Sequence, residues 1–245
     1  MEKSRHSLAG LFQAAVEIHA FCGFPQMRHF HQACLLPVVV IPTDFAEDPI
    51  VFMFEEYANL VTDVDSLAAR LTERYRSHLV CRAGCSGCCD HDLSVFEVEA
   101  DAVRTAVQAL PAGLRQRLAR QVREAQEHNA RGEPVACPLL VNNRCSIYEA
   151  RPIICRSQGL PLLYRAEDGN PEVDYCLLNF TQPGAIQDLD ADYLVQLDGV
   201  NLKLAITNLN YCQSLGLIPS ESGKRKPMSA IILEVEEQSW GKTSL

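Results

Sequence analysis

Three stretches of the chain carry apolar side chains at every third or fourth position. They cover residues 54–75, 114–125 and 193–211, and this spacing is typical of helices that bury one face. We therefore predict an amphipathic helix over each stretch, extended by a few residues at its ends.

Start and stop signals add a fourth helix and place several helix ends. Residues 94–97, Ser-Val-Phe-Glu, match a capping box and predict a helix that begins there. Pro111 suits the first position of the next helix, and residues 131–134, Arg-Gly-Glu-Pro, end it. Gly216 ends the last helix, which we expect to begin near Asp192.

Two short hairpins are predicted between the third and the last helix. Asn142 and Asn143 separate two apolar runs, and asparagine tolerates the left-handed conformation that a tight hairpin turn needs. Residues 168–170, Asp-Gly-Asn, repeat this arrangement, and residues 149–155 are expected to form one or two helical turns. The predicted fold class is mainly α with short β-hairpins (α+β), a small helical domain with a cysteine-rich region.

Composition divides the chain into three parts. Residues 1–52 are rich in histidine and proline without a sustained period, and we interpret them as a poorly organised N-terminal extension. Residues 53–218 hold the predicted helices and hairpins and form the main domain. Residues 219–245 are expected to be a polar C-terminal tail, with one short strand at 231–233, Ile-Ile-Leu. A chain that starts at Met53 should then fold as the full chain does.

Charge and hydropathy exclude several classes of function. The net charge of −9 argues against a general binder of nucleic acid or anionic membranes, and the basic residues 224–226 are interpreted as solvated tail. The longest apolar run is far shorter than the roughly 18 residues of a membrane span. The N-terminus lacks the uninterrupted apolar core of a secretory signal. We therefore expect a cytoplasmic protein that binds neither nucleic acid nor a membrane.

Cysteine is the residue type that points to chemistry. The chain has eleven, and three of them, Cys22, Cys34 and Cys212, are expected to be small buried hydrophobes. The reducing cytosol disfavours a disulfide framework, whereas thiolates are the ligands of zinc and of iron–sulfur clusters. The remaining eight lie beside predicted loops and turns, and they could fill one metal site with spares or two sites. These metal-ligand candidates are Cys81, Cys85, Cys88, Cys89, Cys137, Cys145, Cys155 and Cys176.

The adjacent pair Cys88 and Cys89 bears on the number of sites. In an extended segment their side chains would point to opposite faces, so only a tight turn would let both bind one ion. Otherwise they serve two sites, or one of them supports the site without binding. The spacing of Cys81, Cys85 and Cys88 also matches radical enzymes that use S-adenosylmethionine. Their barrel of repeated strand–helix units is not predicted here, so we attribute the match to a different kind of cysteine cluster.

Two runs of sequence resemble a known family. CRAGCSGCCD at 81–90 and ACPLLVNNRCSIYEARPIICR at 136–156 resemble the YkgJ-type cysteine-cluster family, which is described as zinc- or iron-chelating. The resemblance covers roughly residues 75–215 and implies that residues 53–218 form a cysteine-cluster metal-binding domain. The chain departs from the family pattern at one point, because three residues rather than two separate Cys81 from Cys85. The family includes a flagellin lysine N-methylase branch, which implies methyl transfer as one function.

Two arginines on either side of Cys155 are candidates to support the site. The guanidinium groups of Arg151 and Arg156 would offset the negative charge of nearby thiolates and donate hydrogen bonds. The alternative is a surface salt bridge to Glu149 or Asp174. Because the family resemblance includes both arginines, we favour the supporting role.

Two functions follow from these observations. The first is a metal-binding protein whose cysteines hold an iron–sulfur cluster, with a redox or methyl-transfer role. Iron–sulfur is favoured because the thiols outnumber what one structural zinc needs and because Cys137-Pro138 resembles a cluster-ligand run. The alternative is a non-enzymatic zinc-binding module whose metal holds the hairpins together and whose function is to bind a protein partner. The sequence leaves open whether the protein is an enzyme.

Overall fold

The computed structural model describes residues 49–131, 133, 135–217 and 222–241. Within them the chain is mainly helical, with short paired strands, which confirms the predicted α+β class. None of the helices in this part of the chain is both long and apolar enough to span a membrane. The proposed extension at 1–52 lies, up to residue 48, outside the described residues.

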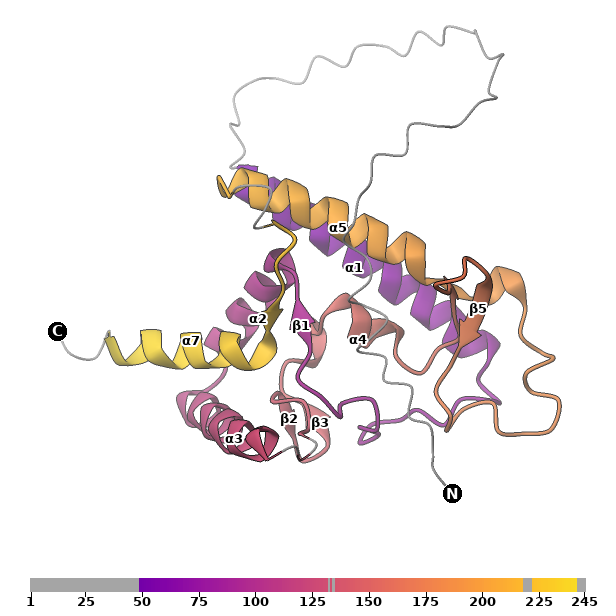
Figure 1. The fold of residues 1–245 in the computed structure, drawn as a ribbon, viewed down its shortest axis with the longest axis horizontal. Helices are drawn as coiled ribbons and strands as arrows, with labels where there is room; N and C mark the ends of the chain where they lie inside the picture. Colours follow the sequence, from indigo (N-terminus) through magenta and orange to yellow (C-terminus); the bar gives the residue numbers. More distant parts are fainter. Residues whose placement is uncertain (1–48, 132, 134, 218–221, 242–245) are drawn as a thin grey trace, which may run out of the picture. The chain divides into compact units, whose positions relative to one another are not determined.

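Helices α1 (Pro49–Arg74) and α5 (Leu197–Ser214) lie side by side (Figure 1). The apolar stripe predicted for each helix supplies the contact, because every third or fourth side chain faces the partner. α1 begins four residues before the predicted Met53, at Pro49, where proline is tolerated in a first helical turn. The buried residues of this layer are Tyr57, Leu60, Val64, Leu204 and Tyr211, with Phe96, Val98 and Ile153 beside them.

A second core joins α2 (Glu97–Ala109), α3 (Ala112–Ala130) and α7 (Met228–Gly241). Its fully buried members include Val103, Val107, Leu118, Val122, Ile231 and Ile232. The predicted strand at 231–233 is therefore wrong. A short apolar run fits either a strand or a buried helix, and here Met228, Ile231, Ile232 and Val235 repeat with helical spacing and face the core.

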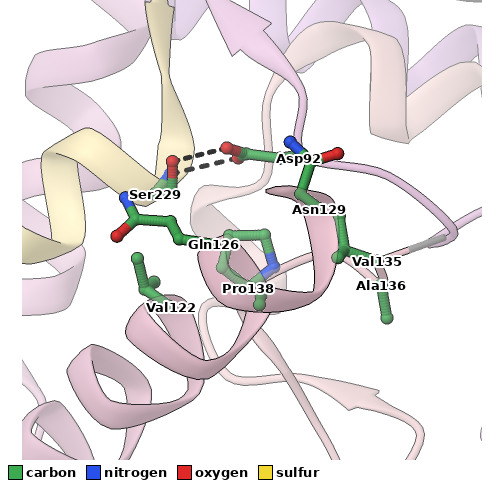
Figure 2. Close-up of a pocket in the computed structure, with 9 residues that line it drawn as sticks. Asp92, Val122, Gln126, Asn129, Val135, Ala136, Pro138 and Ser229 are labelled. Atoms are coloured by element: carbon green, nitrogen blue, oxygen red, sulfur yellow. Dashed lines mark hydrogen bonds between the residues drawn. The ribbon is translucent and has the colours of Figure 1, made fainter. Parts of the chain in front are cut away.

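The segment before α7 is also fixed to the domain. Strand β7 (Lys226–Pro227) pairs antiparallel with β1 (Ser94–Val95), and Arg225 lies over the ring of Phe96 at 4.0 Å. The basic residues 224–226, interpreted as solvated tail, thus lead directly into the packed helix. Asp92 accepts hydrogen bonds from the backbone N–H and the hydroxyl of Ser229 in the first turn of α7 (Figure 2). An acidic side chain at this end also interacts favourably with the helix dipole.

Two predicted helix starts are shifted. Ser94 does not cap α2, because it belongs to strand β1, and Phe96 occupies the N-cap instead. The carboxylate of Glu99 accepts the backbone N–H of Phe96 at 3.3 Å, which satisfies one of the free donors at the helix start. Pro111 is the N-cap of α3 rather than its first helical residue.

Both predicted hairpins are confirmed. Strands β2 (Leu140–Val141) and β3 (Arg144–Cys145) are joined by Asn142 and Asn143, whose φ angles are 51° and 58°. Positive φ at both positions is the requirement of a type I′ turn, which asparagine meets at low energy. The hairpin fixes Cys145 directly opposite Leu140.

The second hairpin extends into a three-stranded sheet. β4 (Leu162–Arg165) and β5 (Pro171–Asp174) flank the turn at Gly169, which has a φ of 82°. β6 (Val195–Gln196) pairs with β4 in parallel, and a 3₁₀ turn, η3 (Ala191–Tyr193), precedes it. α5 therefore begins at Leu197, later than the predicted start near Asp192, because the residues before it complete this sheet.

Candidate metal centre

All eight candidate cysteines lie in the described part of the chain, and all are free thiols. They occur on the loop after α1, near the β2–β3 hairpin, in α4 (Ile153–Ser157) and after β5. Such short, irregular segments allow thiols from distant parts of a sequence to face one another. Cys212, by contrast, is buried in α5 and its thiol contacts Asn208, as expected for a cysteine that only packs.

Two consecutive tight turns shape the loop that carries the first four cysteines. Cys85 N–H donates to Arg82 C=O, and Cys89 N–H donates to Ser86 C=O, both at 2.9 Å. Gly84 has a φ of 89°, a value that suits glycine at the third position of the first turn. The second turn contains Cys88, so this segment is not extended.

The turn brings the thiols of Cys88 and Cys89 into contact. Their hydrogen bond raises the pKa of Cys88 and lowers the pKa of Cys89, because the proton stays on Cys88 and stabilises the Cys89 thiolate. The alternative that the two side chains point to opposite faces does not apply here.

Four of the cysteines form a group that we call the inner set: Cys89, Cys137, Cys145 and Cys155. The backbone joins three of them, because Cys137 N–H donates to Cys89 C=O at 3.0 Å and Leu140, which lies opposite Cys145, donates to Cys137 C=O at 3.0 Å. Cys137 belongs to the α2–α3–α7 core, and Cys89 and Cys145 pack against that core.

Cys155 reaches the inner set through α4, which Glu99 holds in place. The Glu99 carboxylate is only 2 % exposed and accepts the N–H of Ile153 at 3.0 Å, at the first residue of α4. Burial raises the pKa of Glu99, and the two backbone N–H groups that it accepts oppose this effect. Nothing in the local sequence shows that the Glu99 carboxylate will join the start of α2 to the start of α4.

The thiols of the inner set interact electrostatically in every pairing. Cys89 interacts with the other three, Cys137 interacts with Cys145, and Cys155 interacts with both Cys137 and Cys145. Burial raises the pKa of Cys137 to about 11 and also raises the pKa values of Cys145 and Cys155. The protein alone therefore keeps these thiols protonated, and a cation that binds them must displace their protons.

The other four cysteines, Cys81, Cys85, Cys88 and Cys176, form what we call the outer set. Cys81 is their common neighbour, since it interacts electrostatically with the other three. Burial, with smaller contributions from these thiols, raises the pKa of Cys81, while a hydrogen bond from Asn179 opposes the rise. Cys81, Cys85 and Cys88 are exposed, whereas Cys137 of the inner set is buried.

The two arginines take different positions beside the inner set. Arg151 stacks on the ring of Tyr148 at 4.0 Å, and its charge opposes the rise in the pKa of Cys145. Arg156 is buried and donates to the carboxylate of Asp65 in α1, to Arg151 C=O at 2.9 Å and to Glu149 C=O at 2.6 Å. The partner of Arg156 is therefore Asp65, and neither of the carboxylates considered from the sequence, Glu149 and Asp174, takes that place.

Replacing Arg156 should loosen the turn that carries Cys155. The Arg156→Ala protein should lose about 1.5–3 kcal/mol of unfolding free energy, because hydrogen bonds from a charged donor to two carbonyls and Asp65 disappear. Arg156→Lys should restore only part of this unfolding free energy, since lysine lacks the planar fork of the guanidinium group. Urea unfolding measures the free energy of each variant, and elemental analysis measures its metal content. Arg165→Ala, which removes an exposed arginine bonded to Gly169 C=O, is the control, and an equal loss in that protein would contradict the assignment.

A cleft near the inner set does not expose its thiols. It lies between α3, the first turn of α7 and residues 135–138, with Asp92 and Ser229 bonded to each other at one side (Figure 2). Pro138 lines the cleft, but the preceding Cys137 does not. Solvent in the cleft therefore contacts the polar side chains of Asp92, Gln126 and Asn129 rather than a cysteine sulfur.

The donor chemistry fits a metal, although the side chains are not drawn together around one. In the described residues, no three Cys, His, Asp or Glu side chains are arranged to hold a metal ion. The two sets are instead defined by the segments that carry them, and Cys88 interacts with members of both sets. Four free thiols per set match the all-cysteine ligand sets of tetrahedral zinc and of common iron–sulfur clusters.

Comparison with known proteins agrees with this chemistry. Residues 80–176 match the CxxCxxCC family, described as a "putative zinc- or iron-chelating domain". Neither the curated proteins nor the solved structures include a significant match to the chain. The matched segment contains all eight cysteines of the inner and outer sets, and metal binding by these cysteines is the property that the match supports. Over residues 80–176, the chain is thus similar to the CxxCxxCC cysteine-cluster family.

Proposed function

We propose that the inner set holds an iron–sulfur cluster and that the protein has a redox or methyl-transfer role. The observation that carries this proposal is that backbone hydrogen bonds and one shared core bring together the segments of Cys89, Cys137 and Cys145. The thiol of Cys155 interacts with those of Cys137 and Cys145. The four come from a loop, a hairpin and a short helix, so the group forms only in the folded domain.

The surroundings of the inner set support a cluster. The backbone N–H groups of Leu139 and Ile147 donate to the sulfurs of Cys137 and Cys145, respectively, and stabilise the thiolate forms. Hydrogen bonds to sulfur, net charge and solvent exposure are what set the potential of an iron–sulfur centre. Arg151 adds a positive charge close to Cys145. When bound, a cluster would supply one-electron chemistry; these residues would hold it, offset its charge and limit its contact with water.

A structural zinc is the second candidate, and one observation favours it. Strands β2 and β3 have two residues each and α4 has five, which is too short for any of them to be stable alone. A zinc ion bound by four thiolates would hold these pieces together. The protein would then serve as a binding module, and the exposed Leu177 and Leu178 are candidate contacts for a protein partner.

The metal itself distinguishes the two functions. The full chain is purified without oxygen and analysed for iron, acid-labile sulfide and zinc. We expect a brown protein with visible absorption and equal iron and sulfide, because four thiolates are the usual ligands of a cluster. A colourless protein with bound zinc would favour the structural module, and a chain without either metal would contradict metal binding.

A further inference from the structure

A tight turn exposes two adjacent leucines to solvent. Asn179 N–H donates to Cys176 C=O at 2.8 Å, so residues 176–179 form the turn, with Leu177 and Leu178 at its centre. Leu177 is 86 % exposed and Leu178 is 54 % exposed. On the adjoining segment Val80 is 50 % exposed, and its N–H donates to the Asn179 side chain at 2.9 Å. Large apolar side chains that gather in one exposed place indicate an interaction surface, whereas a single exposed leucine does not.

The residues that follow the leucines anchor this turn in the fold. The Asn179 side chain is 2 % exposed and donates to Gly159 C=O at 2.7 Å. Phe180 N–H donates to His78 C=O at 2.9 Å, and its ring packs against Tyr75 with 5.4 Å between the centroids. Phe180 has a φ of 55°, which is costly for a large side chain and persists because these contacts fix it. The leucines are thus presented by an ordered turn, and a partner that covers them loses little affinity to ordering.

The chain around the turn is acidic. Residues 166–202 contain no lysine or arginine. Within the described residues, the carboxylates of this segment form no ion pair with lysine or arginine, and Asp188 contacts His78 at 3.2 Å. The cysteine loop contributes the exposed Arg82, so carboxylates outnumber cations here. The acidic residues of this segment are Glu167, Asp168, Glu172, Asp174, Asp188, Asp190, Asp192 and Asp198.

We propose that Leu177, Leu178 and Val80 form a docking surface for a protein partner whose contacting segment is both apolar and basic. The apolar side chains of the partner would cover the leucines, and its lysines or arginines would complement the surrounding carboxylates. A Cβ atom on Gly87 would lie 3.9 Å from the Leu178 side chain, so the partner would lie against the cysteine loop. This inference rests on the partner-binding function named above and deepens it, but it does not depend on which metal the inner set holds.

Peptide display on the full, metal-loaded chain tests this surface. A phage library of random peptides is selected on the immobilised protein, and fluorescence anisotropy gives the affinity of each recovered peptide. We expect peptides rich in large apolar residues and in lysine or arginine, with an affinity that falls as the salt concentration rises. Leu177→Ser and Leu178→Ser should each weaken their binding by about 5- to 30-fold.

Two further variants separate this surface from a general effect. Leu202→Ser is the matched control, because Leu202 is 61 % exposed on α5, outside the turn, and this change should leave the affinity unchanged. Asp174→Asn removes a carboxylate close to the turn, so it should weaken the binding of the basic peptides and reduce its dependence on salt. Metal content and melting temperature should match the wild-type chain in every variant.

Three results would contradict parts of this picture. Recovered peptides that are acidic, or that bind the double variant Leu177→Ser/Leu178→Ser as tightly as the wild-type chain, would overturn the docking surface. A dimer of the wild-type chain in sedimentation, dissociated by these changes, would assign the surface to a second copy and overturn the basic partner. A chain without bound metal that still selects apolar, basic peptides through Leu177 would refute metal binding and leave the docking surface standing.

Discussion

Cys155→Ser should deplete the metal of the inner set and destabilise the domain in the same experiment. The Cys155 thiol interacts with Cys137 and Cys145, and no other side chain of α4 can replace it as a sulfur ligand. Because the inner set forms only in the folded chain, metal-binding free energy is also folding free energy. We expect most of the inner-set metal to be lost and the melting temperature to fall by more than the roughly 4 °C of an ordinary 1 kcal/mol substitution.

Cys212→Ser is the matched control for this change. Cys212 is 1 % exposed, so its replacement disturbs a packed position, yet it belongs to neither set. It should cost at most about 1–3 kcal/mol and leave metal content unchanged. Metal per chain from elemental analysis, with thermal unfolding of both proteins, measures the difference. Equal metal content in the two variants would show that Cys155 is not a ligand.

Ile232→Ala in α7 should lower the unfolding free energy by about 2–5 kcal/mol, the range for truncating a large side chain in a packed core. Ile232 is 1 % exposed and belongs to the same core as Cys137. Loss of packing there should therefore also speed the release of metal from the inner set. Urea unfolding gives the free energy, and transfer of metal to a chelator gives the release rate.

The same helix provides the control. Glu237 is exposed on α7, and Glu237→Ala should change the unfolding free energy by no more than about 0.5 kcal/mol. A chain that ends at Pro227 should behave like a more severe form of Ile232→Ala. Unchanged stability in the truncated chain would mean that residues 228–241 act as a dispensable tail.

The local pattern of the sequence was enough to predict most elements of secondary structure. The three-to-four-residue period over 54–75 and 114–125 predicts α1 and α3, because a helix that packs on one side must repeat its apolar residues at that spacing. Asn142 and Asn143 predict the hairpin because few residues accept positive φ at two successive positions. The crowding of cysteines and the family resemblance likewise indicate the candidate ligands from the sequence alone.

Only the tertiary structure decided which candidate ligands lie near one another. The turn between Ser86 and Cys89 places the adjacent thiols of Cys88 and Cys89 together, and the N–H of Cys137 donates to the Cys89 carbonyl, which joins this turn to the segment before the β2–β3 hairpin. The roles of Asn179 and Glu99 are also invisible in the sequence, since each joins segments separated by more than fifty residues. Similarly, Ile231 and its neighbours form a helix rather than a strand because α2 and α3 provide the surface that buries them. Periodicity records which face of an element is buried, but the partner that buries it depends on long-range packing, and so does the choice of which thiols meet.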